Sequence, residues 1–347
     1  MSSDDFVDAQ PVPPVEASIV SQTDNETSSA TRPQHSRTNF SSQDCVDYPI
    51  ITVPVNKDTQ CYNMHHKRRG DAYIFHHTEF DSNLVLGERK DDKDLLQKLS
   101  DILTDRLEFN VKVFKDLKYK KIEEEIKKAA NENHKNSDCI LFVFMTHGSN
   151  DKLYARNTHY TLDPLRSLFT SEKCRTLAGK PKIFIIQVCF SFNNYRGKLN
   201  FSFLINLIGQ QACRGSLVDE GTLIPLCPNR RISSSAMDGP SIPYKLSTHA
   251  DFLIAYATVS NYAAYRTWFL QALCKVLDSE ENQKDDFLSM MTTVQREVAI
   301  SFESELGDKQ IPSLTSLLTR KIYFTQKEKP RNTLTNRMSC INSNISE

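Results

Sequence analysis

The sequence predicts an open α/β fold with a mostly parallel central sheet. Apolar segments typical of buried strands alternate along the chain with segments of helical periodicity. One strand-like segment, residues 137–148, contains a continuous apolar run that stops at polar residues, as a central parallel strand does. An irregular stretch with four prolines, residues 216–248, then separates two groups of such segments. We therefore expect one sheet built from two parts of the chain.

The individual elements follow from their periodicity. Strands are expected over residues 72–77, 110–114, 137–148, 182–186, 251–259 and 320–324, of which 72–77 and 182–186 look buried and 110–114 alternates. Helices are expected over residues 94–107, 121–133, 161–169, 268–277 and 287–304. The first helix shows the pattern clearly, because six apolar side chains share one of its faces: Leu95, Leu96, Leu99, Ile102, Leu103 and Leu107.

Composition excludes several classes of function. Lys+Arg and Asp+Glu both total 43, so the charge gives no argument for a nucleic-acid or anionic-membrane partner. The first residues lack the basic and apolar regions of a secretory signal, and no run of 18 apolar residues occurs, so we expect a cytoplasmic protein without a membrane partner. The nine cysteines include no CxxC pair, which argues against a disulfide framework and a structural zinc site. We expect no metal and no cofactor.

Two strand ends carry side chains suited to nucleophilic catalysis. The strand before Thr146 runs into His147 and Gly148, and the strand over 182–186 runs into Gln187, Val188 and Cys189. Reactive groups of open α/β sheets gather at the carboxyl ends of strands. A histidine and a cysteine there form a candidate base and nucleophile, although such a pair alone is a weak signal.

Five blocks then resemble the caspase family in the family's order. The pentapeptide QACRG (211–215) is a local signature of the caspase nucleophile. YNMHHKRRGDAYIFHH, NSDCILFVFMTHG and KCRTLAGKPKIFIIQ are similar to segments of the large subunit, and YKLSTHADFLIAYATV and KQIPSLTSLLTRKIYF to segments of the small subunit. The resemblance covers about residues 60–325. It implies the caspase–hemoglobinase fold, with a mostly parallel six-stranded sheet flanked by helices.

The resemblance also implies roles for particular residues. Cys213 would be the attacking thiolate and His147 the proton carrier, with the N–H groups of Gly148 and Cys213 binding the oxyanion. Arg89, Gln211 and Arg266 would bind the substrate's aspartate. The alternative interpretation of Arg89 is a solvated charge ahead of a helix, because the family's Arg-x-Gly-Thr is here Arg-Lys-Asp-Asp.

A 24-residue segment, 188–211, interrupts this resemblance. Its removal joins Gln187 to Ala212 and restores a continuous caspase sequence, in which Gln187 replaces Gln211 in the pocket. Two hypotheses remain open, an unspliced intron read in frame and a genuine insert. If the segment is translated, Cys189 is the alternative nucleophile to Cys213.

The resemblance further implies a short-leader executioner protease of apoptosis, made as a zymogen that cleaves peptides and proteins after aspartate. The expected division is a disordered leader (1–55), a large-subunit region (56–238), a small-subunit region (239–327) and a disordered tail (328–347). Processing is expected after Asp238, and removal of the leader after Asp24 or Asp47. Family analogy adds a homodimer formed through residues 320–324, an upstream initiator caspase and inhibitor-of-apoptosis proteins. The alternative function is a catalytically impaired paralogue that acts as a dimer partner or decoy.

Overall fold

A computed structural model gives the arrangement of the chain. It describes residues 58–86, 89, 92–149, 152–189, 222–224, 244–259, 262, 264–265 and 267–327. The leader 1–55, the tail 328–347 and the expected processing sites therefore lie outside the described residues. No helix within the described ranges is long and apolar enough to cross a membrane.

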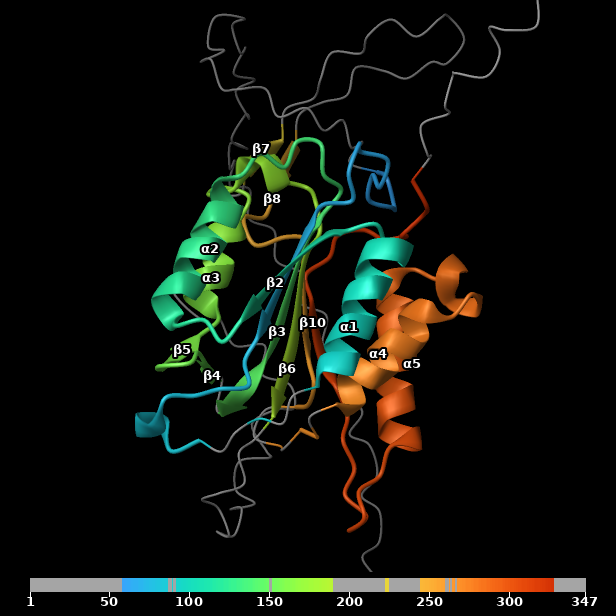
Figure 1. The fold of residues 1–347 in the computed structure, drawn as a ribbon. Helices are drawn as coiled ribbons and strands as arrows, with labels where there is room; N and C mark the ends of the chain where they lie inside the picture. Colours follow the sequence, from blue (N-terminus) through green and yellow to red (C-terminus); the bar gives the residue numbers. More distant parts are fainter. Residues whose placement is uncertain are drawn as a thin grey trace, which may run out of the picture. The chain divides into compact units, whose positions relative to one another are not determined.

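The central sheet has the order β10-β9-β6-β3-β1-β2 (Figure 1). Its strands are β1 (Asp71–His76), β2 (Asn110–Lys115), β3 (Ile140–Ser149), β6 (Lys182–Cys189), β9 (Phe252–Tyr256) and β10 (Ser313–Ser316). The first five are parallel, and only β10 runs antiparallel, against β9. The predicted mostly parallel sheet is confirmed. Its β6–β9 pair joins segments from the two sides of the irregular stretch.

Helices cover both faces of this sheet (Figure 1). One face packs against α1 (Lys93–Asp101), which continues as a π-helical turn (Ile102–Arg106), and against α4 (Trp268–Asp278) and α5 (Phe287–Ser301). The other face packs against α2 (Tyr119–Asn131) and the single turn α3 (Asp163–Arg166). The smaller strands are β4 (Lys152–Tyr154), β5 (His159–Thr161), β7 (Thr222–Ile224) and β8 (Tyr244–Leu246).

Alternation along the strands distributes side chains between the two layers. In β3, Leu141, Val143 and Met145 join the core under α1, α4 and α5. Phe142 and Phe144 join the core under α2 and α3, where neighbouring strands contribute stacked aromatic rings. Since both faces are covered, β3 is apolar from Ile140 to Met145, which is why the sequence predicted it well.

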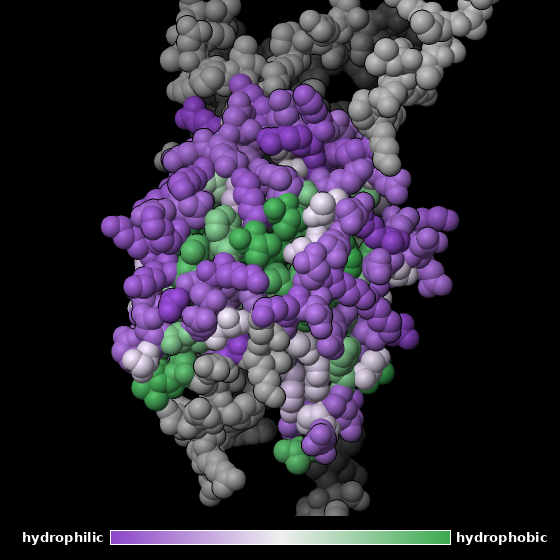
Figure 2. All heavy atoms as spheres, viewed as in Figure 1, coloured by the Kyte–Doolittle hydropathy of each residue, from purple (hydrophilic) through white to green (hydrophobic). Residues whose placement is uncertain are grey.

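The edge strand β2 is less well covered. Figure 2 shows hydrophobic side chains gathered over this edge, between the two helical layers. Val113 is exposed there, and Val111 and Phe114 are half-buried.

The expected strand over residues 320–324 is wrong. Lys321 forms only an isolated bridge with Cys61, and the apolar residues Ile322 and Phe324 pack into the core beside α5. The last strand is instead β10, whose sequence SLTS has a single large apolar residue and gives no strand signal. Side-chain packing, and not strand pairing, explains the apolar residues of 320–324.

A buried ionic cluster closes the amino end of β1. Asp138 accepts hydrogen bonds from Arg69 Nη1 (2.9 Å) and from His66 Nδ1 (3.0 Å), and Lys327 Nζ also binds it. The same ammonium group donates to the carbonyls of Met64 and His66. This cluster connects the segment before β1 with residue 327, close to the end of the described chain.

Candidate active site

The carboxyl ends of β1, β3 and β6 meet at one edge of the sheet. Parallel pairing places Met145 beside Gln187 and His147 beside Cys189. Neighbouring strands lie about 4.8 Å apart, so the backbones of His147 and Cys189 are close. The strand β6 is longer than the expected 182–186 and includes the first two residues of the interrupting segment, Val188 and Cys189. Of the two candidate cysteines, Cys189 is thus the one within the described residues.

The imidazole of His147 is largely shielded from water. His147 is 7% exposed, and its ring lies 4.9 Å from the ring of Phe80, centroid to centroid. Phe80 belongs to the loop after β1, and sequence reasoning missed it because a lone aromatic residue in a loop carries no periodic signal. The loop therefore positions an apolar cover over the candidate base.

Asp116 fixes the start of that loop. Its carboxylate accepts hydrogen bonds from the backbone N–H groups of Thr78 (2.7 Å) and Glu79 (2.9 Å). Burial alone would raise the pKa of Asp116, but these donors to the charged carboxylate outweigh it and lower the pKa below its ordinary value. Asp116 therefore stabilises the backbone that carries Phe80.

Gly148 lies where no side chain fits. A Cβ atom at this position would lie 2.1 Å from Cγ1 of Val188 and 2.6 Å from the carbonyl oxygen of Lys152. The β3–β4 hairpin pairs Gly148 with Leu153, which brings that backbone close. The glycine is required by this approach.

Arg89 is a buried residue, which excludes the interpretation as a solvated charge. Arg89 is 3% exposed, and its backbone N–H donates to the carbonyl of Thr78 (3.2 Å). Its guanidinium donates from Nη1 to Asp92 Oδ1 (3.2 Å) and from Nη2 to Asp92 Oδ2 (2.8 Å). Arg89 thus lies beside the end of β1, linked to the residue that precedes α1.

Asp92 connects Arg89 to the last residue of β1. Its Oδ1 lies 2.7 Å from Nε2 of His76, and both residues are buried. Burial would raise the pKa of Asp92, but the hydrogen bond from His76 and the charge of Arg89 outweigh it and lower the pKa. Asp92 is therefore a buried carboxylate that stays ionised. The sequence showed it only as a departure from the family's threonine.

Gln187 connects β6 with the segment before α4. Its side chain is fully buried, and Nε2 donates to the carbonyl of Tyr265 (3.3 Å). Its Oε1 has no hydrogen-bond partner within the described part of the chain. Tyr265 stacks on Trp268 with ring centroids 3.9 Å apart. An amide with one unused oxygen is thus placed one strand away from His147.

The structure leaves several expected site residues outside its described ranges. They are Cys213, Gln211, Arg266, Asp238, Asp24 and Asp47. Within those ranges, His147, Gly148 and Gln187 gather at the tips of β3 and β6, and Arg89 lies beside β1. The residues that the sequence analysis did not single out are Phe80, Asp92, His76 and Asp116.

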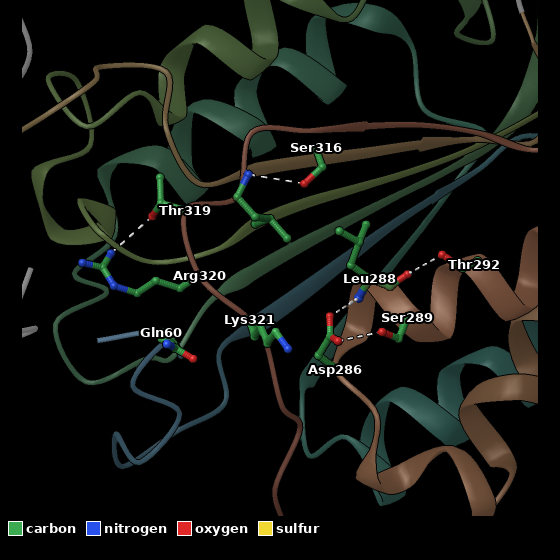
Figure 3. A pocket seen from close by; sticks show the side chains of 10 residues that line it. Gln60, Asp286, Leu288, Ser289, Thr292, Ser316, Thr319, Arg320 and Lys321 are labelled. Atoms are coloured by element: carbon green, nitrogen blue, oxygen red, sulfur yellow. Dashed lines mark hydrogen bonds between the residues drawn. The ribbon is translucent and has the colours of Figure 1, made fainter. Parts of the chain in front are cut away.

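A separate hollow of about 630 Å³ lies where α5 begins and the chain leaves β10 (Figure 3). Asp286 caps α5 there by accepting from the N–H of Leu288, and Arg320 and Thr319 line the opposite side. The hollow contains none of the expected site residues, so it is not the candidate active site.

Comparison with known proteins decides the family. A family model described as "Caspase domain" matches residues 69–323. The chain belongs to the caspase family. It is 37% identical to caspase-1 of Spodoptera frugiperda over 292 residues, which cover 80% of this chain and 86% of that protein. It is also 37% identical to caspase drICE of Drosophila melanogaster over 280 residues, which cover 77% and 73%.

A solved structure shows the same fold. The crystal structure of Spodoptera frugiperda caspase-1 matches this caspase with a TM-score of 0.62 and 35% identity, over 80% of this chain and 98% of the other. This caspase is a cysteine protease of apoptosis that cleaves after aspartate. The comparisons give no support to the alternative of a decoy paralogue.

Proposed function

We propose that His147 carries protons for a thiolate at the carboxyl end of β6. The thiolate attacks the carbonyl carbon after the substrate's aspartate, and the new C–S bond produces a tetrahedral oxyanion. When the C–N bond breaks, the imidazolium of His147 gives its proton to the leaving amine. Water, deprotonated by the same imidazole, then hydrolyses the thioester and restores the thiol. The pairing of His147 with the last residue of β6 is the observation that carries this proposal.

Two cysteines compete for the role of nucleophile. The strand register supports Cys189, because this residue is paired with His147. The QACRG motif supports Cys213, which lies outside the described residues. We assign the nucleophile of this chain to Cys189, and Cys213 remains the alternative that the experiment below separates from it.

The proposed substrate pocket uses a guanidinium and an amide. Arg89 binds the aspartate carboxylate, and Gln187 contributes its amide group, with Arg266 as a further cation from outside the described ranges. The N–H of Gly148 binds the oxyanion. The burial of Arg89 and Gln187 supports these roles, because water does not screen their polar groups.

A peptidyl-aspartyl fluoromethyl ketone tests the nucleophile. The attacking thiolate displaces fluoride and forms a stable thioether, which peptide mass spectrometry locates. We expect the label on Cys189, its loss in C189S and its retention in C213S. A label that moves with Cys213 would reassign the nucleophile. Full labelling of H147A, or no label on the wild-type protein, would overturn the proposed dyad.

The finer biological expectations form part of the same proposal. This caspase is a cytoplasmic zymogen, processed after Asp238 and, in the leader, after Asp24 and Asp47, by an upstream initiator caspase. It forms a homodimer and is a target of inhibitor-of-apoptosis proteins.

Because residues 320–324 form no strand, the edge strand β10 replaces them as the proposed dimer contact. Within the described chain β10 pairs only with β9. Sedimentation of wild-type protein and of an S316P variant tests the dimer, which this proline should disrupt, because Leu317 bonds toward β9 and the alternation along the strand turns the N–H of Ser316 to the outer edge.

A further inference from the structure

Two clusters that each join an arginine, an aspartate and a histidine lie at opposite ends of β1, and the one at the amino end also includes Lys327. The cluster at the amino end contains Arg69, Asp138 and His66, and the cluster at the carboxyl end contains Arg89, Asp92 and His76. Only the second includes a residue of the proposed substrate pocket. The carboxylate of Asp92 can therefore affect substrate binding, and the carboxylate of Asp138 in the first cluster serves as a comparison.

Asp92 occupies the end of the Arg89 side chain. Both carboxylate oxygens accept from the two terminal nitrogens, at 3.2 Å and 2.8 Å, in a bidentate pair. Arg89 and Asp92 are 3% and 8% exposed, so water screens neither charge well. The remaining nitrogen of Arg89, Nε, is buried and has no hydrogen-bond partner among the residues that the structure describes. The guanidinium thus has one N–H group whose hydrogen bond is not used within the described residues.

We propose that Asp92 is a specificity-determining residue that weakens the binding of the substrate's aspartate. The inference rests on the proposed role of Arg89 in the pocket. With its terminal nitrogens occupied, Arg89 offers an incoming carboxylate only the edge that carries Nε. That carboxylate also meets the like charge of Asp92 in a poorly screened site, and such repulsion opposes binding.

The charge balance of the pocket follows from the same contacts. The negative charge of Asp92 cancels the positive charge of Arg89, and Nε2 of His76 lies 2.7 Å from the same Oδ1 atom that Arg89 Nη1 contacts. An arginine without a paired carboxylate would attract the substrate's aspartate more strongly. In this caspase the other proposed pocket groups, Gln187 and Arg266, therefore contribute a larger share of aspartate binding. A pocket with less positive charge also discriminates less between aspartate and its uncharged isostere, asparagine.

Direct binding of two short peptides tests this role of Asp92. The peptides are identical except for a carboxyl-terminal aspartate or asparagine amide, and calorimetry on the full chain gives each Kd. In D92N the side chain keeps its shape and loses its charge. We expect the Kd of the aspartate peptide to fall about tenfold, the size of effect that one like charge typically exerts at a partly buried site. The Kd of the asparagine peptide should stay the same.

D138N is the matched control, because it removes the same charge from the cluster at the other end of β1. It should bind both peptides as the wild-type protein does. D92T is a second variant, measured alongside D92N, and thermal unfolding shows that each variant is folded. An unchanged or raised Kd for the aspartate peptide in the folded Asp92 variants would overturn the inference.

Failure of this inference is distinct from failure of the proposed function. If the fluoromethyl ketone labels the thiol and the Asp92 variants bind the aspartate peptide no better, only the role of Asp92 is wrong. If no variant binds the aspartate peptide, the Arg89 pocket is wrong, and the inference falls with it. If the thiol is not labelled but D92N binds the aspartate peptide more tightly, the inference stands and the dyad is wrong.

Discussion

At the scale of single residues, Gly148 has the tightest surroundings of the site. In G148A the new methyl group would overlap Val188 and the carbonyl of Lys152, so the β3–β4 hairpin must shift. A shift of about 1 Å at a reacting group costs about a hundredfold in rate, which is the loss in kcat that we expect. Hydrolysis of a fluorogenic aspartyl peptide measures it. The double variant G148A/V188A removes one of the two overlaps and should recover part of the loss; wild-type kcat in G148A would contradict the assignment.

Phe80 provides the second prediction at this scale. Its ring covers that of His147, so F80A opens the imidazole to water and loosens its position. A positioned general base typically raises the reaction rate a hundredfold or more, and F80A loses only part of that positioning. We therefore expect kcat to fall about tenfold. F80L keeps an apolar cover and is the control, with near wild-type kcat. Equal rates in all three proteins would show that the cover has no effect.

The cysteines differ in reactivity for a physical reason. Burial raises the pKa of the Cys139 and Cys274 thiols to about 12, so both stay protonated at pH 8. Cys61 is exposed. Under native conditions we expect iodoacetamide to modify Cys61 and to leave Cys139 and Cys274 intact, as peptide mapping will show. Rapid modification of Cys139 without unfolding would contradict the buried environment. The C61S variant removes this background from the labelling of the nucleophile.

At the scale of elements, the loop after β1 depends on Asp116. D116A removes the acceptor of two backbone N–H groups, so we expect a loss of about 2 kcal/mol in the free energy of unfolding. Because the folded-state pKa of Asp116 is lowered, its stabilisation is present above the ordinary carboxyl pKa and disappears as the pH falls below about 4. Urea unfolding of both proteins at pH 7 and pH 3 measures this. The difference between them should shrink at pH 3; a constant difference would exclude the charged carboxylate as its source.

Elements differ in how well the sequence predicted them. Strands buried on both faces, such as β3, contain an unbroken apolar run, and their position was predicted closely. β10 escaped prediction because an edge strand needs few apolar side chains. Residues 320–324 were assigned wrongly, since an apolar run fits a strand and a buried irregular segment equally well. For the candidate site, the family resemblance pointed to His147 and Gly148, which stay predictions, whereas the contacts of Phe80 and Asp116 depend on loop geometry that no local pattern encodes.

At the scale of the whole molecule, one sheet and the hydrophobic clusters on its two faces combine the two parts of the chain. Five residues of β6 pair with five of β9, and both strands contribute to the same two hydrophobic clusters. Cleavage within residues 225–243 should therefore leave the two fragments associated. After limited proteolysis we expect both fragments to elute together in size-exclusion chromatography and to separate only in denaturant. Separate elution under native conditions would contradict the shared core.

The contacts of Lys327 have a practical consequence for anyone who shortens this protein. Its ammonium group reaches back to Asp138 and to two carbonyls of the segment before β1, so a carboxyl-terminal truncation that removes it deprives a buried carboxylate of one of its cations. A crystallographer who trims the carboxyl terminus should therefore keep Lys327.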